Sequence, residues 1–134
     1  MLRAAGFSQH PPPQHERGSA PAEFVLVGCL LTALAVAIVQ LTLVLHVRNT
    51  LVDAAASAAR YGVLADRSAE DAQLRATDLI TASLGAAYAS DVSVEESRIG
   101  EIDVVEVRVR APLPVVGLLG PGGILEVSGH APLQ

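Results

Sequence analysis

The residues from Phe24 to Leu45 form an apolar run without a charge, interrupted only by the polar residues Thr32, Gln40 and Thr42. About 20 apolar residues in a helix are enough to cross a hydrocarbon core of roughly 30 Å. The run is longer than the apolar region of an ordinary signal peptide, usually about 7–15 residues. The sequence therefore predicts one transmembrane helix near the N-terminus, and a chain of 134 residues leaves room for one small domain beside it.

The charge and the reactive side chains exclude several classes of function. The net charge of −5 argues against a nucleic-acid partner, which would need a basic patch. Cys29 is the only cysteine, so it can form neither an intrachain disulfide nor a cysteine-based metal site. The four histidines are not in a metal-ligand spacing, and Gly120–Gly123 lacks the Lys-Ser/Thr of a phosphate loop. We expect no enzyme activity, no cofactor, no metal and no small-molecule substrate.

The acidic residues of the C-terminal half have two possible interpretations, the polar face of a hairpin or a calcium site. The sequence favours the hairpin face. These residues are Glu95, Glu96, Glu101, Asp103 and Glu106.

The charges beside the apolar run do not fix its orientation in the membrane. Arg3 and Arg17 precede the run, and Arg48 and Arg60 follow it. Cytoplasmic flanks usually carry the excess of basic residues. Because the two counts are equal, the orientation stays open at this point.

The segment Arg17–Phe24 resembles a type IV prepilin processing site. A glycine follows a basic residue, four small residues come next, and then an acid and an aromatic lead into the apolar run. By this resemblance the cut falls between Gly18 and Ser19, and Glu23 becomes the fifth mature residue. A glutamate in lipid is costly unless a cation pairs with it, and a neighbouring subunit's new α-amino group would supply one. The alternative is that Glu23 is an ordinary first-turn acid and Gly18 a linker residue.

The helical pattern continues beyond the membrane. The residues after the apolar run are rich in alanine, the best helix former, and contain no proline, so one helix from about Pro21 to Val63 is predicted. Ala55 and Ala59, with Ala58 and Gly62, form small-x-x-x-small pairs that permit close packing. The alternative is that these alanines lie on a solvated helix.

A second helix is predicted to begin after Ser68, which can cap it together with Asp71. Asp71 and Arg75 are spaced for an i,i+4 ion pair, and Gly85 can end the helix. One stripe of this segment is apolar at helical spacing. It consists of Ala72, Ala76, Leu79, Ile80 and Ala87.

The pattern then changes to a period of two, which predicts three antiparallel strands. Val92 and Val94 alternate with polar residues, Gly100 supplies a turn, and a third strand follows at 124–128. Val105, Val107 and Val109 should face the core, since alternate residues of a strand share one face. The apolar loop Ala111–Leu119 is either a strap over the sheet or an exposed contact patch, and the strap is favoured. The predicted fold class is α+β.

Together these features resemble the TadE-like family, a pilin-like component of the tight-adherence (Tad/Flp) pilus system. The resemblance covers roughly residues 17–65. It rests on Arg17-Gly18, on Glu23-Phe24-Val25-Leu26-Val27 and the apolar run, and on Ala58-Ala59-Arg60-Tyr61-Gly62, which is similar to the family's Ala-Ala-Arg-x-Gly segment. Pro21, and Gly28-Cys29 where many relatives carry a proline, depart from the family pattern.

The resemblance implies a non-enzymatic minor pilin or pseudopilin with a type IV pilin-like fold, held in the cytoplasmic membrane by one helix. Its partners would be a prepilin peptidase, other pilin-like subunits and the Tad assembly platform. Residues 1–18 would be a cleaved cytoplasmic leader, 19–65 the transmembrane and extended helix, and 66–134 a small extracytoplasmic domain. Gly18 and Ser19 would serve processing, and Glu23 and Phe24 would serve assembly.

Two rival functions remain. The first is a secreted or surface binding domain, released by signal peptidase near Ala54–Ala59, where small residues fit an A-x-A site. The second is a single-span accessory subunit of another membrane complex, for which Gly18 would have no role. The mature N-terminus distinguishes the three functions.

Overall fold

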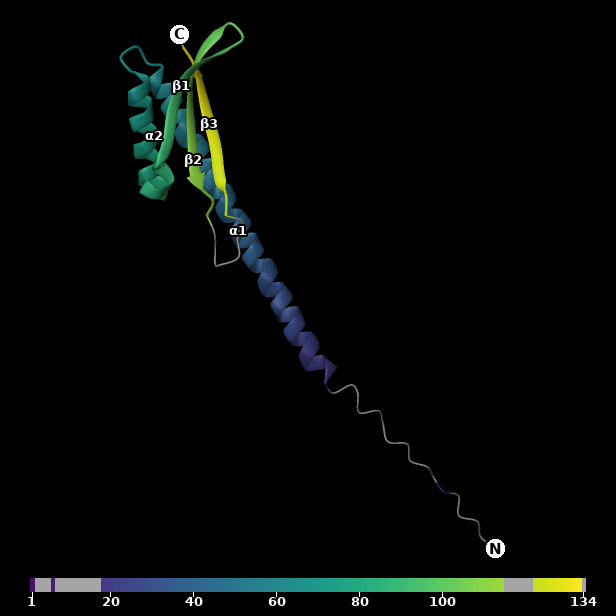
Figure 1. Cartoon of the computed structure of the whole chain (residues 1–134). Coiled ribbons are helices and arrows are strands. Elements are labelled where there is room, and N and C mark those ends of the chain that lie inside the picture. The colour runs from purple at the N-terminus through teal and green to yellow at the C-terminus, as the bar shows by residue number, and fades with distance from the viewer. Residues whose placement is uncertain (2–5, 7–17, 115–121, 134) are drawn as a thin grey trace. The chain divides into compact units, whose positions relative to one another are not determined.

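The computed structural model describes residues 1, 6, 18–114 and 122–133. Its elements are α1 (Ser19–Gly62), α2 (Ala69–Leu84), the 3-10 helix η2 (Ala86–Ala89), β1 (Asp91–Ile99), β2 (Ile102–Pro112) and β3 (Ile124–Pro132), as Figure 1 shows. A long N-terminal helix, a second helix and an antiparallel sheet confirm the predicted α+β class. The chain divides into two compact units, Met1–Val36 and Ala37–Gln134. The predicted divisions after residues 18 and 65 stay predictions.

Helix α1 confirms the long helix expected from the sequence, with bounds within two residues of those predicted. Pro21 is its third residue, where backbone amides have no partner within the helix, so the missing N–H costs nothing. The described part of the first unit consists of Met1, Gly6, Gly18 and the N-terminal part of α1. The C-terminal part of α1 belongs to the second unit, in which it is a core element.

Helix α2 begins with the capping box that the sequence predicts. The Ser68 hydroxyl accepts a hydrogen bond from the Asp71 amide, and the Asp71 carboxylate accepts one from the Ser68 amide. Gly85 ends the helix at a φ of +98°, a conformation that favours glycine, and its amide donates to the Thr81 carbonyl. Both ends of α2 therefore form where local sequence places them.

The three strands form one antiparallel sheet in the order β1-β2-β3. Gly100, at a φ of +65°, lies in the turn between β1 and β2. Val92 pairs with Val109 across β1 and β2, and Val109 pairs with Val127 across β2 and β3. Because these three residues are buried, one face of the sheet supplies the core and the other carries polar side chains.

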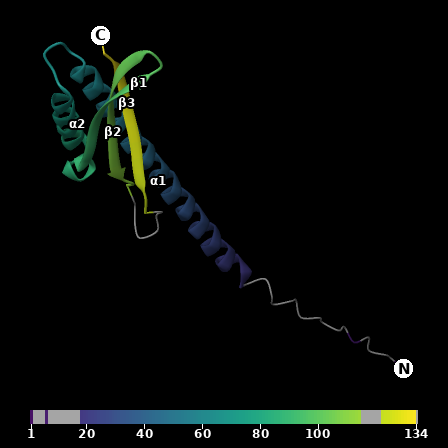
Figure 2. The same cartoon turned by 45° about the horizontal axis from the view of Figure 1, so that its top comes forward.

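The core lies between that inner face and the two helices, which cover the same face of the sheet (Figure 1 and Figure 2). Val105, Val107 and Val109 are buried, as the period of two predicts. Alanines dominate on the helices, so the backbones approach closely. The helical core residues are Val47, Leu51, Ala54, Ala55, Ala58, Ala59, Ala72, Ala76 and Ile80.

Three sequence-based expectations differ from the structure. Asp71 is held by Ser68 in the capping box, and the ion pairs of the described residues do not include one between Asp71 and Arg75. Ala87 lies exposed in η2, because α2 ends at Leu84 before the apolar stripe reaches it. Strand β3 continues to Pro132, beyond the predicted end at residue 128, because its pairing with β2 extends to Val104.

The apolar loop predicted over Ala111–Leu119 is described only in part. Ala111 is a buried residue of β2, and Leu113 and Pro114 follow the strand. Residues 115–121, including most of the loop and two residues of its glycine-proline turn, lie outside the described residues.

Candidate functional site

The predicted processing site lies at the start of α1. Gly18 directly precedes the first helical residue, Ser19, and an added Cβ at Gly18 would meet no atom within 4 Å. Glu23 occupies the fifth helical position and is exposed, and Phe24 beside it is 79% exposed. Four helical residues thus separate the predicted cut from the acid. This accessible arrangement suits both a protease and a neighbouring subunit, but the roles of all four residues stay predictions.

No cation of the described residues lies within ion-pair distance of Glu23. The carboxylate stands at the head of an apolar helix, where a charge without a partner would be costly in lipid. The local sequence places it in the second turn of α1, beyond the free backbone amides of the first turn. Any cation that offsets its charge in a membrane therefore has to come from outside the part of the chain that the structure describes.

The apolar run forms a helix that exposes large side chains on all sides. Among the described residues, α1 is the one helix long and apolar enough to cross a membrane, and none of its most apolar window is buried. The Thr32 and Thr42 hydroxyls each donate 2.8 Å hydrogen bonds to carbonyls four residues earlier, those of Gly28 and Ile38. Both hydroxyls are thereby satisfied within the helix, so the run suits a lipid environment.

Gln40, the remaining polar residue of the run, reaches outside the helix. Its side-chain amide donates a hydrogen bond to the Pro114 carbonyl, just beyond the end of β2. Both residues belong to the second unit. Within the apolar run, the side chain that is most costly in lipid is thus satisfied by the Pro114 carbonyl, a contact that the sequence did not predict.

The small residues of α1 pack within the chain. Ala55, Ala58 and Ala59 are buried in the core, which confirms the close-packing interpretation over that of a solvated helix. A Cβ added to Gly62 would lie 2.7 Å from the Ala72 Cβ, so Gly62 permits α2 to approach α1. The described residues that these small side chains contact belong to the sheet and α2.

The Tyr61 ring contacts two arginine side chains, and the sequence analysis predicted neither contact. The Arg67 guanidinium carbon is 4.8 Å from the ring centroid, and that of Arg75 is 5.7 Å away. Both distances suit cation–π contact. The contacts join the end of α1 to the following turn and to α2. Arg75 thus contacts Tyr61 and not Asp71.

The outer face of the sheet carries a network of charged side chains. Glu106 contacts the Arg108 guanidinium at 3.0 Å and the His130 ring at 3.6 Å. Glu126 contacts Arg108 at 3.4 Å and Arg110 at 2.9 Å. The hydrogen bond and the charge of Glu106 raise the pKa of Arg108. As the sequence analysis favoured, Glu106 belongs to the polar face of the hairpin.

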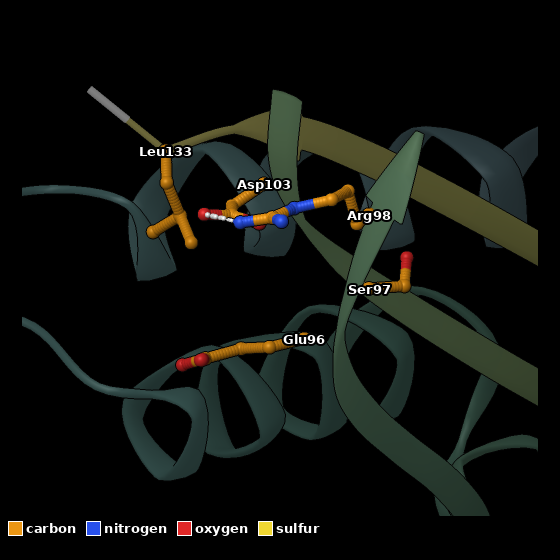
Figure 3. A pocket seen from close by; sticks show the side chains of 5 residues that line it. All are labelled: Glu96, Ser97, Arg98, Asp103 and Leu133. Carbon is orange, nitrogen blue, oxygen red and sulfur yellow. Dashed lines mark hydrogen bonds and ion pairs between the residues drawn. The ribbon is translucent and has the colours of Figure 1, made fainter. Parts of the chain in front are cut away.

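A hollow of about 340 Å³ lies beside the end of β1 and the start of β2 (Figure 3). The Arg98 Nε and the Asp103 Oδ1 approach to 2.7 Å, and this hydrogen bond raises the pKa of Arg98. Both side chains are more than half exposed. Across the described residues, no group of three or more His, Cys, Asp or Glu side chains could hold a metal ion. The hollow is lined by Glu96, Ser97, Arg98, Asp103 and Leu133.

Comparison with known families gives a match to the N-terminal part of the chain. Residues 18–60 match the model of the family described as TadE-like protein. The match begins at Gly18 and includes the apolar run and Ala58-Ala59-Arg60, so the resemblance inferred from the sequence is confirmed over this segment. Neither the curated proteins nor the solved structures gave a match. This TadE-like segment suggests a Tad pilus-associated protein, and the apolar helix that it includes is consistent with a membrane anchor.

Proposed function

We propose that this chain, TadE-like over residues 18–60, is a non-enzymatic minor pilin or pseudopilin of a Tad/Flp pilus or a related secretion assembly. Helix α1 anchors it in the cytoplasmic membrane, and a prepilin peptidase cuts between Gly18 and Ser19. The leader, residues 1–18, lies in the cytoplasm. The domain that follows α1 lies on the other side of the membrane. The observation that carries the proposal is the match that begins at Gly18, one residue before α1 starts.

The partners follow from the same arrangement. The apolar surface of α1 favours lipid before assembly and other pilin-like helices after it, together with the proteins of the assembly platform. Glu23 would pair with the Ser19 α-amino group of a neighbouring subunit, a cation that exists only after the cut. Phe24 would add apolar surface beside that pair.

The packing of α1 argues against the secreted alternative. A signal peptidase cut near Ala54–Ala59 would remove Val47 and Leu51 from the core and separate them from the sheet. Leu51 is fully buried, and deleting a buried side chain of this size costs about 2–5 kcal/mol. The folded unit therefore needs the part of α1 that such a cut would remove.

Intact-mass spectrometry of the membrane-extracted protein tests the proposed processing. The wild-type protein should lack residues 1–18, and Gly18→Ala should retain them, because glycine lets the backbone approach the protease closely. Gly6→Ala is the matched control: it alters a glycine of the leader, so its mature mass should equal that of the wild type. A wild-type protein that retains residues 1–18 in a strain with active prepilin peptidase would overturn the proposal and favour the accessory subunit.

A further inference from the structure

The β2–β3 hairpin extends along α1 toward the apolar run. A Cβ added to Gly129 in β3 would lie 2.3 Å from the Ala56 nitrogen, so β3 and α1 approach each other closely at these two residues. The sixteen residues back to Gln40 rise about 24 Å along a helix. Val107 pairs with Gly129, and the seven residues from Val107 to Pro114 span about 24 Å along a strand. The hydrogen bond from Gln40 to Pro114 agrees with both estimates.

The charged residues of α1 and those of the β2–β3 hairpin stop at about the same distance from the Gly129–Ala56 contact. Glu126 lies three residues before Gly129, about 10 Å along β3, and pairs with Arg110 at 2.9 Å. Arg48 lies eight residues before Ala56, about 12 Å along α1. Beyond Arg110 and Glu126, the described residues 111–114 and 122–125 carry no charge, just as residues 24–45 of α1 carry none. One plane therefore separates charged from apolar residues on both elements.

The backbone of the hairpin end suits a place with little water. Pro112 and Pro114 have no N–H, and the Leu113 amide donates a 3.1 Å hydrogen bond to the Gly123 carbonyl. The Pro114 carbonyl accepts from Gln40. Across these three residues every backbone donor is thus absent or paired, which a lipid environment demands. Ile124 on the opposite strand is 75% exposed, so its apolar side chain has no cover within the described chain.

We propose that the hairpin end, defined by Leu113, Pro114, Gly122, Gly123 and Ile124, lies in the lipid interface beside α1. Gln40 is five residues before Leu45, so it lies about 8 Å inside the apolar run. Interfacial elements reach about 5–10 Å into the boundary between headgroups and acyl chains. The folded unit is then held against the bilayer at two places, the helix and the hairpin end. The proposal rests on α1 crossing the membrane and is independent of the pilus role.

Fluorescence quenching in vesicles tests the hairpin contact. The full chain is reconstituted in phosphatidylcholine vesicles, and a cysteine is labelled with an environment-sensitive dye. One variant is Cys29→Ser with Ile124→Cys. The matched control is Cys29→Ser with Ile102→Cys, an isoleucine that is 56% exposed at the other end of β2. Circular dichroism checks that both variants keep the native helix and sheet content.

We expect nitroxide lipids labelled near the headgroup to quench the dye at position 124 several-fold more than at position 102, and aqueous iodide to do the reverse. Equal iodide quenching at both positions would overturn the proposal. Protection from iodide without quenching by lipid, lost as the protein is diluted in lipid, would identify a second copy as the cover and also overturn it.

The native cysteine separates failure of this inference from failure of the anchor. Cys29 lies within the apolar run and is exposed on α1. A dye there should be quenched by nitroxides placed deep in the acyl chains. If Cys29 is quenched and position 124 is not, the hairpin contact alone is wrong. If neither is quenched, α1 does not cross the membrane, and the proposed anchoring is wrong as well.

Discussion

Gly129 of β3 lies directly on the backbone of Ala56 in α1. A Cβ at Gly129 would come within 2.3 Å of the Ala56 nitrogen and 2.6 Å of its Cα. These are backbone atoms, which cannot move aside as a flexible side chain can. The sheet therefore packs on the helix at a distance that only glycine permits at this position.

Gly129→Ala should destabilise the folded unit by about 1–3 kcal/mol or more, because an extra methyl in a packed core forces the backbone to shift. Thermal unfolding of the full chain in detergent, followed by circular dichroism, measures the loss. Gly122→Ala is the matched control, since a Cβ there meets no atom within 4 Å. Equal melting temperatures for the two variants would contradict the close approach.

Gly62→Ala should also destabilise, because its Cβ would lie 2.7 Å from that of Ala72. The loss should be smaller than at Gly129, about 1 kcal/mol, since the opposing atom is a side-chain methyl. Adding Ala72→Gly should recover part of the loss that Gly62→Ala causes. A double-mutant cycle on the melting temperature tests this coupling. If the changes in melting temperature of the two single variants simply add in the double variant, residues 62 and 72 are not in contact.

Ser68→Ala should lower stability by about 0.5–2 kcal/mol, because the Asp71 amide would lose the hydroxyl that caps α2. Ser83→Ala changes the same residue type at an exposed position near the end of the same helix. Helix propensity favours alanine there, so this control should be neutral or stabilising. Urea unfolding of the full chain in detergent compares them, and an equal loss in both would argue against the capping role.

Glu23→Gln should leave membrane insertion and the proposed cut after Gly18 intact yet prevent the proposed assembly, because a neutral amide would not offset a neighbouring subunit's ammonium. Glu70→Gln, which neutralises an exposed acid in the first turn of α2, is the control and should assemble normally. Electron microscopy of strains carrying only the variant copy scores pili. Normal filaments with Glu23→Gln would make Glu23 an ordinary acid of the helix start.

Local patterns predicted most of the fold. The Ser68–Asp71 capping box, the stop at Gly85 and the alternation of valines in β2 each depend on residues close in sequence, and all three are confirmed. The contacts of Gly129 and of Gln40 join residues far apart in the chain, so no local sequence pattern predicts them. Asp71 had two possible partners at compatible spacing, and the structure shows that the cap takes precedence over Arg75.

The candidate site was predicted from composition and resemblance more than from geometry. The exposed start of α1 is consistent with Gly18 and Glu23 in their expected roles but assigns neither. The small residues illustrate the difference. Their spacing predicted close packing correctly, whereas the partners, β3 and α2, became visible only once the strands were placed against the helix.

The Gly129–Ala56 contact can form only after both segments have been synthesised. Ala56 is synthesised before Gly129, which follows it by 73 residues and lies in β3. Contacts between distant parts of a chain form late, because a long loop must close first. The part of α1 that contacts β3 therefore stays uncovered until β3 has been synthesised and can pack on it. A chain truncated before β3 would therefore leave part of the alanine face of α1 exposed.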